Sequence, residues 1–367
     1  MKFTVNKTDM NEAVSNIQRT VSSKTSIPAL EGILLDASED QLSLSAYDLE
    51  LGITTVIPAK VQEPGRSVLS ARIFSEIVRR TPSDAIEITV DSKNMATIES
   101  GCSNFTLIGI PAEEFPELPK VADAVKIQLP SNVLKSIIRQ TVFAVAESNA
   151  KPIHQGSLFH MEDGRLDVVS VDGYRLAMRT EPVNYEGKLS FVTPGKTLNE
   201  ILRLLKDTED MVDIYAGQRH IQFAISNYTV ISSLLEGDFL NYKATIPAAS
   251  KTHVSLRSRD AIESVERVSL LITDRLKSPV RCIFSNNEAK LLCTTSMGRA
   301  SDQVEIEKEG EDVEIGFNNR YLLDALRNTE CDEIRMGLSG PLSPMTIQPK
   351  EGDSFLFLVL PVRLKND

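Results

Sequence analysis

The chain repeats itself three times at a fixed step of 124 residues. In each copy, an amphipathic segment of helical periodicity is followed by a short polar break and a β-rich stretch. Residues that keep this register are Phe74, Leu198 and Leu322, then Val78, Leu202 and Leu326, then Arg79, Arg203 and Arg327. Three copies in one register indicate a triplicated chain, which excludes most single-domain folds for its 367 residues.

The repeats predict an α+β fold. Each copy opens with an alternating strand and a first helical segment, and helices mixed with antiparallel strands in this order do not build a doubly wound sheet. We expect two helices and about eight antiparallel strands per repeat, with domains at 1–124, 125–248 and 249–367. The expected helices cover residues 7–21, 71–81, 131–145, 196–206, 257–270 and 318–328.

Positive charge gathers on the predicted helices, although the chain as a whole is acidic. Lys and Arg total 40 against 51 for Asp and Glu, a net charge of −11. The six helical segments carry +7, so the rest of the chain carries −18. The helix dipole favours cations in a last turn, which accounts for only part of this pattern. A shared basic surface that attracts phosphates without reading bases is the other interpretation.

Signals for catalysis, metals and export are weak or missing. The Gly195-Lys196-Thr197 segment lacks the earlier glycine of a phosphate loop, and the four histidines show no metal-ligand spacing. We therefore expect no enzyme, no cofactor and no metal. The four cysteines show no Cys-x-x-Cys spacing and are expected to be reduced core thiols. Neither a signal segment nor a membrane-spanning run is recognisable, so we expect a cytoplasmic protein.

Five local motifs, together with the repeats, give the chain a family resemblance. They are Ser-Ile-Pro-Ala-Leu at 26–30, Asp-Leu-Glu at 48–50, Asp-Gly-Tyr-Arg-Leu-Ala at 172–177, Ile-Gly-Phe-Asn at 315–318 and Leu-Pro-Val-Arg-Leu at 360–364. Over its whole length the chain resembles the bacterial DNA polymerase III β subunit, the sliding clamp. The resemblance implies a non-enzymatic clamp that slides on duplex DNA without sequence specificity and confers processivity.

The resemblance also implies a head-to-tail homodimer that closes as a six-domain ring of clamp-type domains. Twelve helices, about 9 Å apart, would line a hole about 35 Å wide, which admits a hydrated duplex. Only the lining of the hole needs positive charge, so the negative net charge of the chain does not argue against DNA binding. Matching the family's DNA contacts places Lys24 in a loop at the ring face. The helix patterns add the DNA-facing candidates Arg72, Arg79, Lys135, Arg139, Lys196, Arg203 and Arg320.

For the dimer interface, the match gives two residues on each side. Phe105 and Leu107 are expected on an edge strand of the first repeat, and Leu271 and Ile272 at the end of a helix in the third. The alternative for all four is an ordinary place in the core.

The resemblance further implies a pocket between the second and third repeats that binds short peptide motifs of the replicative polymerase, the clamp loader and other DNA-processing proteins. Matching positions are His154, Val171, Gly173, Tyr174, Arg175, Leu176, Leu240, Thr245, Asn318, Tyr321, Leu342, Pro344, Leu358, Leu360, Pro361, Val362 and Arg363. An apolar pocket with a few polar groups suits an extended peptide with apolar anchors. Four positions depart from the best-known pattern: His154, Val171, Tyr174 and Leu240 replace leucine, threonine, histidine and proline.

Two other classes of function remain as alternatives. A peptide-binding scaffold would keep the ring and the pocket without being retained on DNA. An enzyme would need a catalytic group that the motifs do not reveal. Cations recurring at one register in three repeats favour the clamp over the scaffold.

Overall fold

The computed structural model describes residues 1–22, 25–147, 151–273, 275–276 and 278–364. Six α-helices lie within these residues, and α2, α4 and α6 begin at 71, 195 and 319, the step of the sequence repeat. The helices are α1 (Lys7–Ile17), α2 (Ala71–Arg80), α3 (Ser131–Val142), α4 (Gly195–Leu204), α5 (Ser258–Ser269) and α6 (Asn319–Arg327).

The described chain divides into two compact units, the first made of residues 1–132 and 203–234. It holds two antiparallel sheets, with strand orders β5-β1-β7-β8-β9 and β10-β15-β16-β17-β4-β3-β2-β6. The strands of the first sheet are β5 (Lys60–Glu63), β1 (Lys2–Asn6), β7 (Ala85–Val90), β8 (Met95–Ser100) and β9 (Ser103–Ile108). Those of the second are β10 (Val125–Pro130), β15 (Met211–Ala216), β16 (His220–Ile225), β17 (Tyr228–Ser233), β4 (Leu51–Pro58), β3 (Gln41–Tyr47), β2 (Gly32–Ser38) and β6 (Gly65–Ser70).

The second unit, residues 133–202 and 235–367, also holds two antiparallel sheets. The nine-stranded sheet contains, in order, β14 (Lys188–Pro194), β11 (Gly156–Glu162), β12 (Arg165–Val171), β13 (Arg175–Pro182), β26 (Phe355–Val359), β25 (Met345–Pro349), β24 (Glu333–Leu338), β18 (Thr252–Arg257) and β22 (Glu307–Glu309). The four-stranded sheet contains β21 (Gly298–Glu305), β20 (Glu288–Thr295), β19 (Val280–Ser285) and β23 (Val313–Phe317).

Two of these sheets cross a boundary between repeats. In the first unit β4 pairs with β17, so that Leu51 lies opposite Ser232. In the second unit β13 pairs with β26 and places Arg175 opposite Val359. Leu51 and Arg175 are 124 residues apart, so the two junctions repeat one arrangement. The middle repeat consequently supplies strands to both units.

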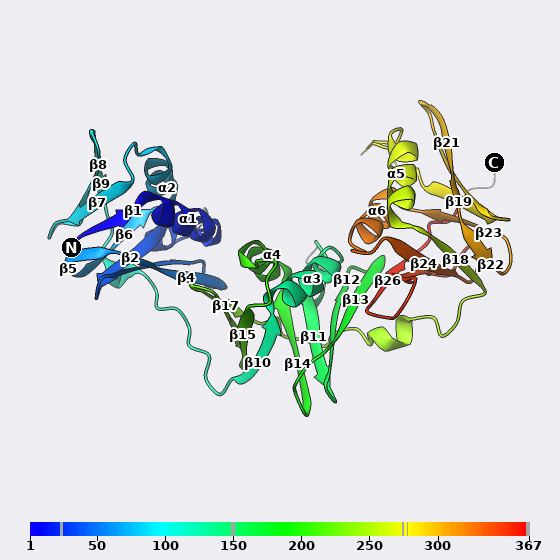
Figure 1. Ribbon diagram of the computed structural model, residues 1–367, viewed down its shortest axis with the longest axis horizontal. Coiled ribbons are helices and arrows are strands. Elements are labelled where there is room, and N and C mark those ends of the chain that lie inside the picture. The colour runs from blue at the N-terminus through cyan, green and yellow to red at the C-terminus, as the bar shows by residue number, and fades with distance from the viewer. Residues whose placement is uncertain (23–24, 148–150, 274, 277, 365–367) are drawn as a thin grey trace. The chain divides into compact units, whose positions relative to one another are not determined.

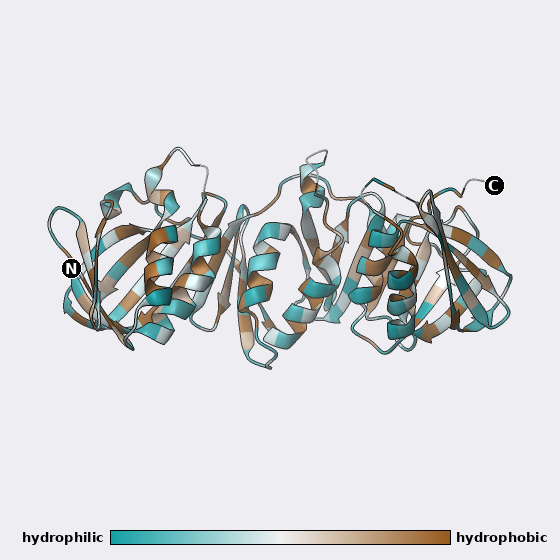
Figure 2. Ribbon diagram, turned by 90° about the horizontal axis from the view of Figure 1, so that it is seen from above, coloured by the Kyte–Doolittle hydropathy of each residue, from teal (hydrophilic) through white to brown (hydrophobic). Residues whose placement is uncertain are grey.

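The helices lie against these sheets with one apolar side. α1 packs beside α2 in the first unit and α5 beside α6 in the second (Figure 1). In α2 the buried residues are Ala71, Phe74, Ile77 and Val78, whose spacing forms one stripe. Figure 2 shows hydrophilic and hydrophobic residues mixed along the helical ribbons. Exposed polar residues lie on every helix, although α3 has only one, Arg139.

The predicted α+β class and the two helices per repeat are confirmed, although helix ends differ from the predicted ones by up to four residues. The first predicted helix ends four residues early, because α1 stops at Ile17 and a short 3-10 turn, Gln18–Thr20, follows. Cys282 and Cys293 are buried as expected and Cys331 is half-buried, but Cys102 is exposed because it occupies the tight turn between β8 and β9. No helix within the described residues is long and apolar enough to cross a membrane.

Replacing Leu322 tests the packing of the helices. Leu322 is buried in the core of the third repeat, so Leu322→Ala should lower the free energy of unfolding by about 2–5 kcal/mol, because a cavity remains. Leu342→Ala is the matched control, since that side chain is 65% exposed. Urea denaturation measures both. Equal stability of the two variants would contradict this packing.

Candidate functional sites

The pocket candidates all belong to the second unit, and strand pairing brings several of them together. Val171 lies opposite Leu176 in the β12–β13 hairpin, and Leu176 lies opposite Leu358 on β26. All three belong to one buried apolar cluster, which Tyr242 and Phe239 of the linker after β17 also join. These residues form an apolar floor that connects the second and third repeats.

Exposed apolar side chains accompany this floor. Five pocket candidates are among the exposed large hydrophobic residues, with exposed fractions between 37% and 65%. They are Tyr174, Leu240, Leu342, Leu360 and Val362. The backbone holds two of them in place, because Leu360 N donates to Tyr174 O at 2.9 Å and Val362 N donates to Gly316 O on β23 at 2.8 Å. An exposed apolar rim over a buried apolar floor is typical of a binding surface.

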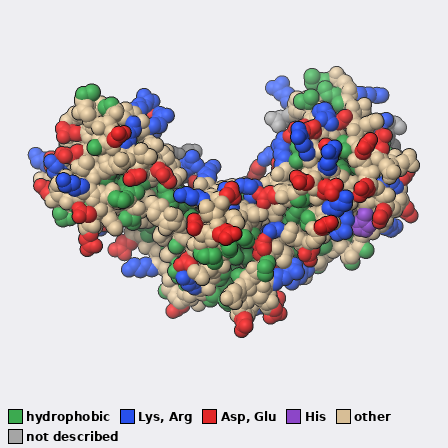
Figure 3. Space-filling view, in the orientation of Figure 1, with side chains coloured by type: hydrophobic (Ala, Val, Ile, Leu, Met, Phe, Trp, Pro, Cys, Tyr) green, Lys and Arg blue, Asp and Glu red, His purple; other side chains and the backbone are tan. Residues whose placement is uncertain are grey.

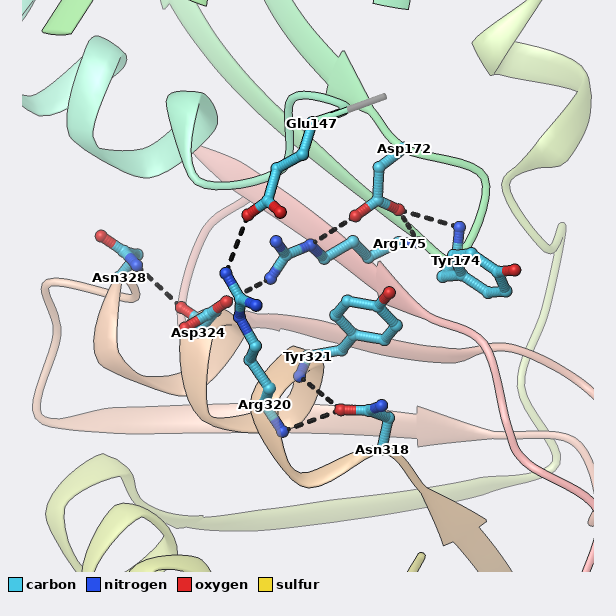
Figure 4. A network of polar contacts seen from close by, with 9 residues as sticks. All are labelled: Glu147, Asp172, Tyr174, Arg175, Asn318, Arg320, Tyr321, Asp324 and Asn328. Carbon is cyan, nitrogen blue, oxygen red and sulfur yellow. Dashed lines mark hydrogen bonds and ion pairs between the residues drawn. The ribbon is translucent and has the colours of Figure 1, made fainter. Parts of the chain in front are cut away.

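Arg175 organises the polar part of this surface (Figure 4). Its side chain is only 6% exposed and makes ion pairs with Asp172, at 2.9 Å, and with Asp324 on α6. The guanidinium also lies 4.8 Å from the centroid of the Tyr321 ring. A buried arginine is tolerated only with such partners. The ion pairs therefore attach α6 to the β12–β13 turn.

Two tyrosines stack beside this arginine. The rings of Tyr174 and Tyr321 have centroids 5.6 Å apart and planes 17° apart. Burial, and next the charge of Asp172, raise the pKa of the Tyr321 phenol, which stays protonated at neutral pH. Asn318 caps α6 by accepting hydrogen bonds from the backbone N of Arg320, at 2.9 Å, and of Tyr321, at 3.3 Å. We call Tyr174, Arg175, Asn318, Tyr321 and Leu360 the tyrosine surface.

The remaining pocket candidates differ in how closely they join this surface. His154 is buried and meets Phe239 edge-on, with ring centroids 5.4 Å apart. Burial, and next the charge of Lys151, lower the pKa of His154, so its ring is neutral at pH 7. Gly173 has open space where a Cβ would stand. Thr245 donates a hydrogen bond to the backbone carbonyl oxygen of Tyr242. Pro344 and Pro361 are half-buried, and Arg363 is exposed.

The candidate DNA contacts lie on the outward sides of four helices. Arg72 and Arg79 are on α2, Lys135 and Arg139 on α3, Lys196 and Arg203 on α4, and Arg320 on α6. All are exposed except Lys135, which is half-buried. Lys24 lies outside the described residues. We call these helix residues, together with Arg327 in the last turn of α6, the helix surface.

The interface candidates lie next to two sheet edges. Phe105 and Leu107 are half-buried on β9, the last strand of the five-stranded sheet. Leu271 and Ile272 are partly buried against the core of the third repeat. They lie just past the C-terminal end of α5, which stops at Ser269 and is followed by a turn.

The two edges correspond to strands that are paired elsewhere in the chain. β21 begins with Gly298 and Arg299, and Arg299 lies 124 residues after Arg175, so β21 is the third counterpart of β4 and β13. β9 is the counterpart of β17, because each is the second strand of the same hairpin in its repeat. Ser103 of β9 pairs with Ser100 of β8, and Tyr228 of β17 pairs in the same way with Ile225 of β16. Within the described residues, β9 and β21 each have a strand on one side only.

Exposed hydrophobic residues that the sequence analysis missed accompany these edges. Leu270 is 81% exposed, Ile108 80% and Met297 69%, the highest values among large hydrophobic residues of the described chain. Ile108 ends β9, Met297 precedes β21 and Leu270 follows α5. An open hollow lined by Ile73, Ile77 and Phe105 lies beside β9, with charged residues of α2 around it. A single hydrophobic residue in a turn or at a strand end creates no periodic pattern. Only the position of these residues within the repeat could have indicated that they are exposed at an edge.

No group of three or more His, Cys, Asp or Glu side chains that suits a metal ion occurs among the described residues.

Comparison with known proteins finds matches over nearly the whole chain. Models of the N-terminal, central and C-terminal domains of the DNA polymerase III beta subunit match residues 1–119, 128–241 and 243–363. The chain is 34% identical to the beta sliding clamp of Bacillus subtilis over 99% of its own length and all of that protein.

Solved structures agree with this match. The crystal structure of the DNA polymerase sliding clamp of Bacillus subtilis superposes with a TM-score of 0.95 at 33% identity, and each chain is covered completely. A sliding clamp of Pseudomonas aeruginosa bound to griselimycin has a TM-score of 0.93 at 28% identity, over 99% of this chain and all of that one.

Replacing Arg175 tests the organisation of the tyrosine surface. Arg175→Met leaves two carboxylates without their buried partner and should lower the free energy of unfolding by about 3 kcal/mol. Arg363→Met, at an exposed position, should change it by less than about 0.5 kcal/mol. Urea denaturation measures both variants. If Arg175→Met is as stable as its control, the ion pairs do not hold α6 in place.

Proposed function

The chain belongs to the DNA polymerase III beta subunit family of sliding clamps, and we propose which of its surfaces perform the tasks of such a clamp. Clamps of this family are non-catalytic, ring-shaped homodimers that encircle duplex DNA. They tether the replicative polymerase and other partner proteins, and so confer processivity in DNA replication. For this chain we retain domains at 1–124, 125–248 and 249–367 and place the protein in the bacterial cytoplasm.

Ring closure involves two of the open sheet edges, those of β9 and β21. We propose that β9 of one copy pairs with β21 of the other, in the arrangement that β4–β17 and β13–β26 already have. The repeat then sets Phe105 opposite Ser301 and Leu107 opposite Arg299 of the second copy. Leu271 and Ile272, with the exposed Leu270, cover the hollow beside β9. Two such contacts close the ring and leave neither edge exposed.

Proline on β9 tests this pairing. Ser233 N donates to Glu50 O, and Leu360 N donates to Tyr174 O, at the two internal junctions. Ile108 is the counterpart of Ser233 and Leu360, so its N–H should point to the open edge of β9. Backbone N–H groups of alternate residues in a strand point to the same side, so the N–H of Thr106 should point to this edge as well. Thr106→Pro should thus convert the dimer to a folded monomer, because proline lacks this donor.

Thr106→Val keeps the N–H and is the matched control. Sedimentation equilibrium measures the mass of both variants, and circular dichroism verifies that each is folded. A dimeric, folded Thr106→Pro variant would exclude the β9–β21 pairing.

DNA contact is assigned to the helix surface. Its exposed cations recur in α2, α3, α4 and α6, whereas the remainder of the chain is acidic. Arginine and lysine attract phosphates at long range without selecting a sequence. Weak contacts of this kind suit a ring that must slide.

Charge reversal tests the helix surface. The variant Arg79→Glu, Arg203→Glu and Arg327→Glu should lose loading or retention on nicked circular DNA, because phosphates are repelled, and should remain dimeric. Retention is measured by gel filtration after loading by a clamp loader. Reversal of Arg219, Arg281 and Arg335, which lie on strands or turns instead of helices, is the matched control. Normal retention of the first variant would remove this assignment.

Partner binding is assigned to the tyrosine surface and its apolar floor. An extended peptide gains affinity from apolar anchors placed over Leu176 and Leu358, with Asn318 and backbone groups at the rim as polar partners. Tyr174 stacks on Tyr321 and widens the aromatic area that such a peptide meets.

Griselimycin, to which the Pseudomonas aeruginosa clamp is bound, serves as the probe of this surface. Tyr321→Ala should weaken griselimycin binding by at least about tenfold, the effect of losing about 1.4 kcal/mol. Isothermal titration calorimetry measures it, with Met211→Ala, an exposed apolar residue elsewhere, as the control. Unchanged affinity of Tyr321→Ala would place the binding surface elsewhere.

A further inference from the structure

Several arginines of the helix surface already have a carboxylate partner. Four ion pairs have this form, and their arginines lie on α2, α3 and α6. They are Arg79–Glu76 at 2.6 Å, Arg320–Glu147 at 2.8 Å, Arg327–Glu266 at 2.6 Å and Arg139–Glu330 at 2.5 Å. We call Glu76, Glu147, Glu266 and Glu330 the competing carboxylates.

The four carboxylates come from unrelated places in the chain. Glu76 precedes Arg79 by one turn of the same helix, whereas Glu266 reaches Arg327 from the neighbouring helix α5. Glu147, which follows α3, reaches Arg320 on α6 (Figure 4). The pairing of these arginines with carboxylates therefore does not follow from a single residue spacing along one helix. Figure 3 shows red and blue side chains next to one another in the part of the second unit that contains α5 and α6.

Three of these pairs are well exposed and are therefore easily exchanged, whereas the side chain of Glu330 is only 24% exposed. The side chains of Arg79, Arg320 and Arg327 are 59%, 65% and 52% exposed in their pairs. Water and salt screen such pairs, so each contributes little to stability and opens readily. A DNA phosphate that approaches one of these arginines must displace a carboxylate that stays within reach and returns when the phosphate leaves.

We propose that the competing carboxylates act as built-in substitutes for DNA phosphates, which keeps the phosphate contacts of these four arginines weak while the ring moves. This inference rests on the assignment of the helix surface to DNA. When an arginine without a partner neutralises a DNA phosphate, a cation condensed on the DNA is released, which contributes about 0.9 to the salt dependence of binding. A paired arginine exchanges one anion for another and contributes less.

The variant Glu76→Gln, Glu147→Gln, Glu266→Gln and Glu330→Gln removes the competition and keeps the side-chain shapes. Its dimer should bind a short fluorescein-labelled duplex more tightly than the unaltered protein at about 50 mM salt. The slope of log K against log salt between about 50 and 200 mM should be steeper by at least about 0.9, for one added phosphate contact. Fluorescence anisotropy gives both quantities.

A second variant with the same charge change is the control. Glu117→Gln, Glu186→Gln, Glu236→Gln and Glu351→Gln lie at exposed positions outside the helices. This control should keep the slope of the unaltered protein. Equal slopes for the first variant and the unaltered protein, or an equal increase in the control, would overturn the proposal.

Two further measurements separate this inference from other outcomes. Glu330 also accepts a hydrogen bond from Ser136 on α3, so a version that keeps Glu330 is compared if the four-site variant does not fold. It should still bind with the steeper slope. Retention of the unaltered protein on nicked circular DNA tests the clamp assignment itself. If the protein is retained but the slopes are unchanged, only the proposal of competing carboxylates is rejected. If the protein is not retained, the assignment of the helix surface to DNA is rejected as well.

Discussion

Antiparallel pairing between the edge strands of successive repeats is the interaction on which this structure depends. Each repeat alone would expose the edge strands that these junctions pair, and open edges invite uncontrolled association. The β4–β17 and β13–β26 pairs remove this problem inside the chain, where they also merge strands of neighbouring repeats into continuous sheets. We propose that the same geometry pairs β9 with β21 of a second copy. The sheet arrangement and the dimeric state are in this way two results of one pairing rule.

The helices convert this framework into functional surfaces. Their apolar stripes fill the space over the sheets, and their polar sides remain exposed with most of the recurring cations. α6 serves two surfaces at once, because Tyr321 faces the tyrosine surface, whereas Arg320 is paired with Glu147 (Figure 4). The buried Arg175 fixes α6 to the β12–β13 turn and so sets the position of both side chains.

Local periodicity predicts much of this fold, and pairing between distant segments accounts for what it misses. Helices α2, α4 and α6 follow from the 124-residue spacing of Phe74, Leu198 and Leu322. The edge position of β21 does not, because it depends on which strands lie beside it. The ion pair of Arg175 with Asp324 joins residues 149 positions apart, and no local pattern indicates it. The pocket candidates came from the family resemblance, not from spacing.

Retention on circular and linear DNA tests the central claim most directly. The protein is loaded onto nicked circular duplex by a clamp loader, and bound protein is measured before and after one cut that linearises the circle. A closed ring should remain on the circle at moderate salt and leave the linear molecule through its ends, because only topology holds it. Equal retention on both forms would show ordinary electrostatic binding and contradict the clamp account.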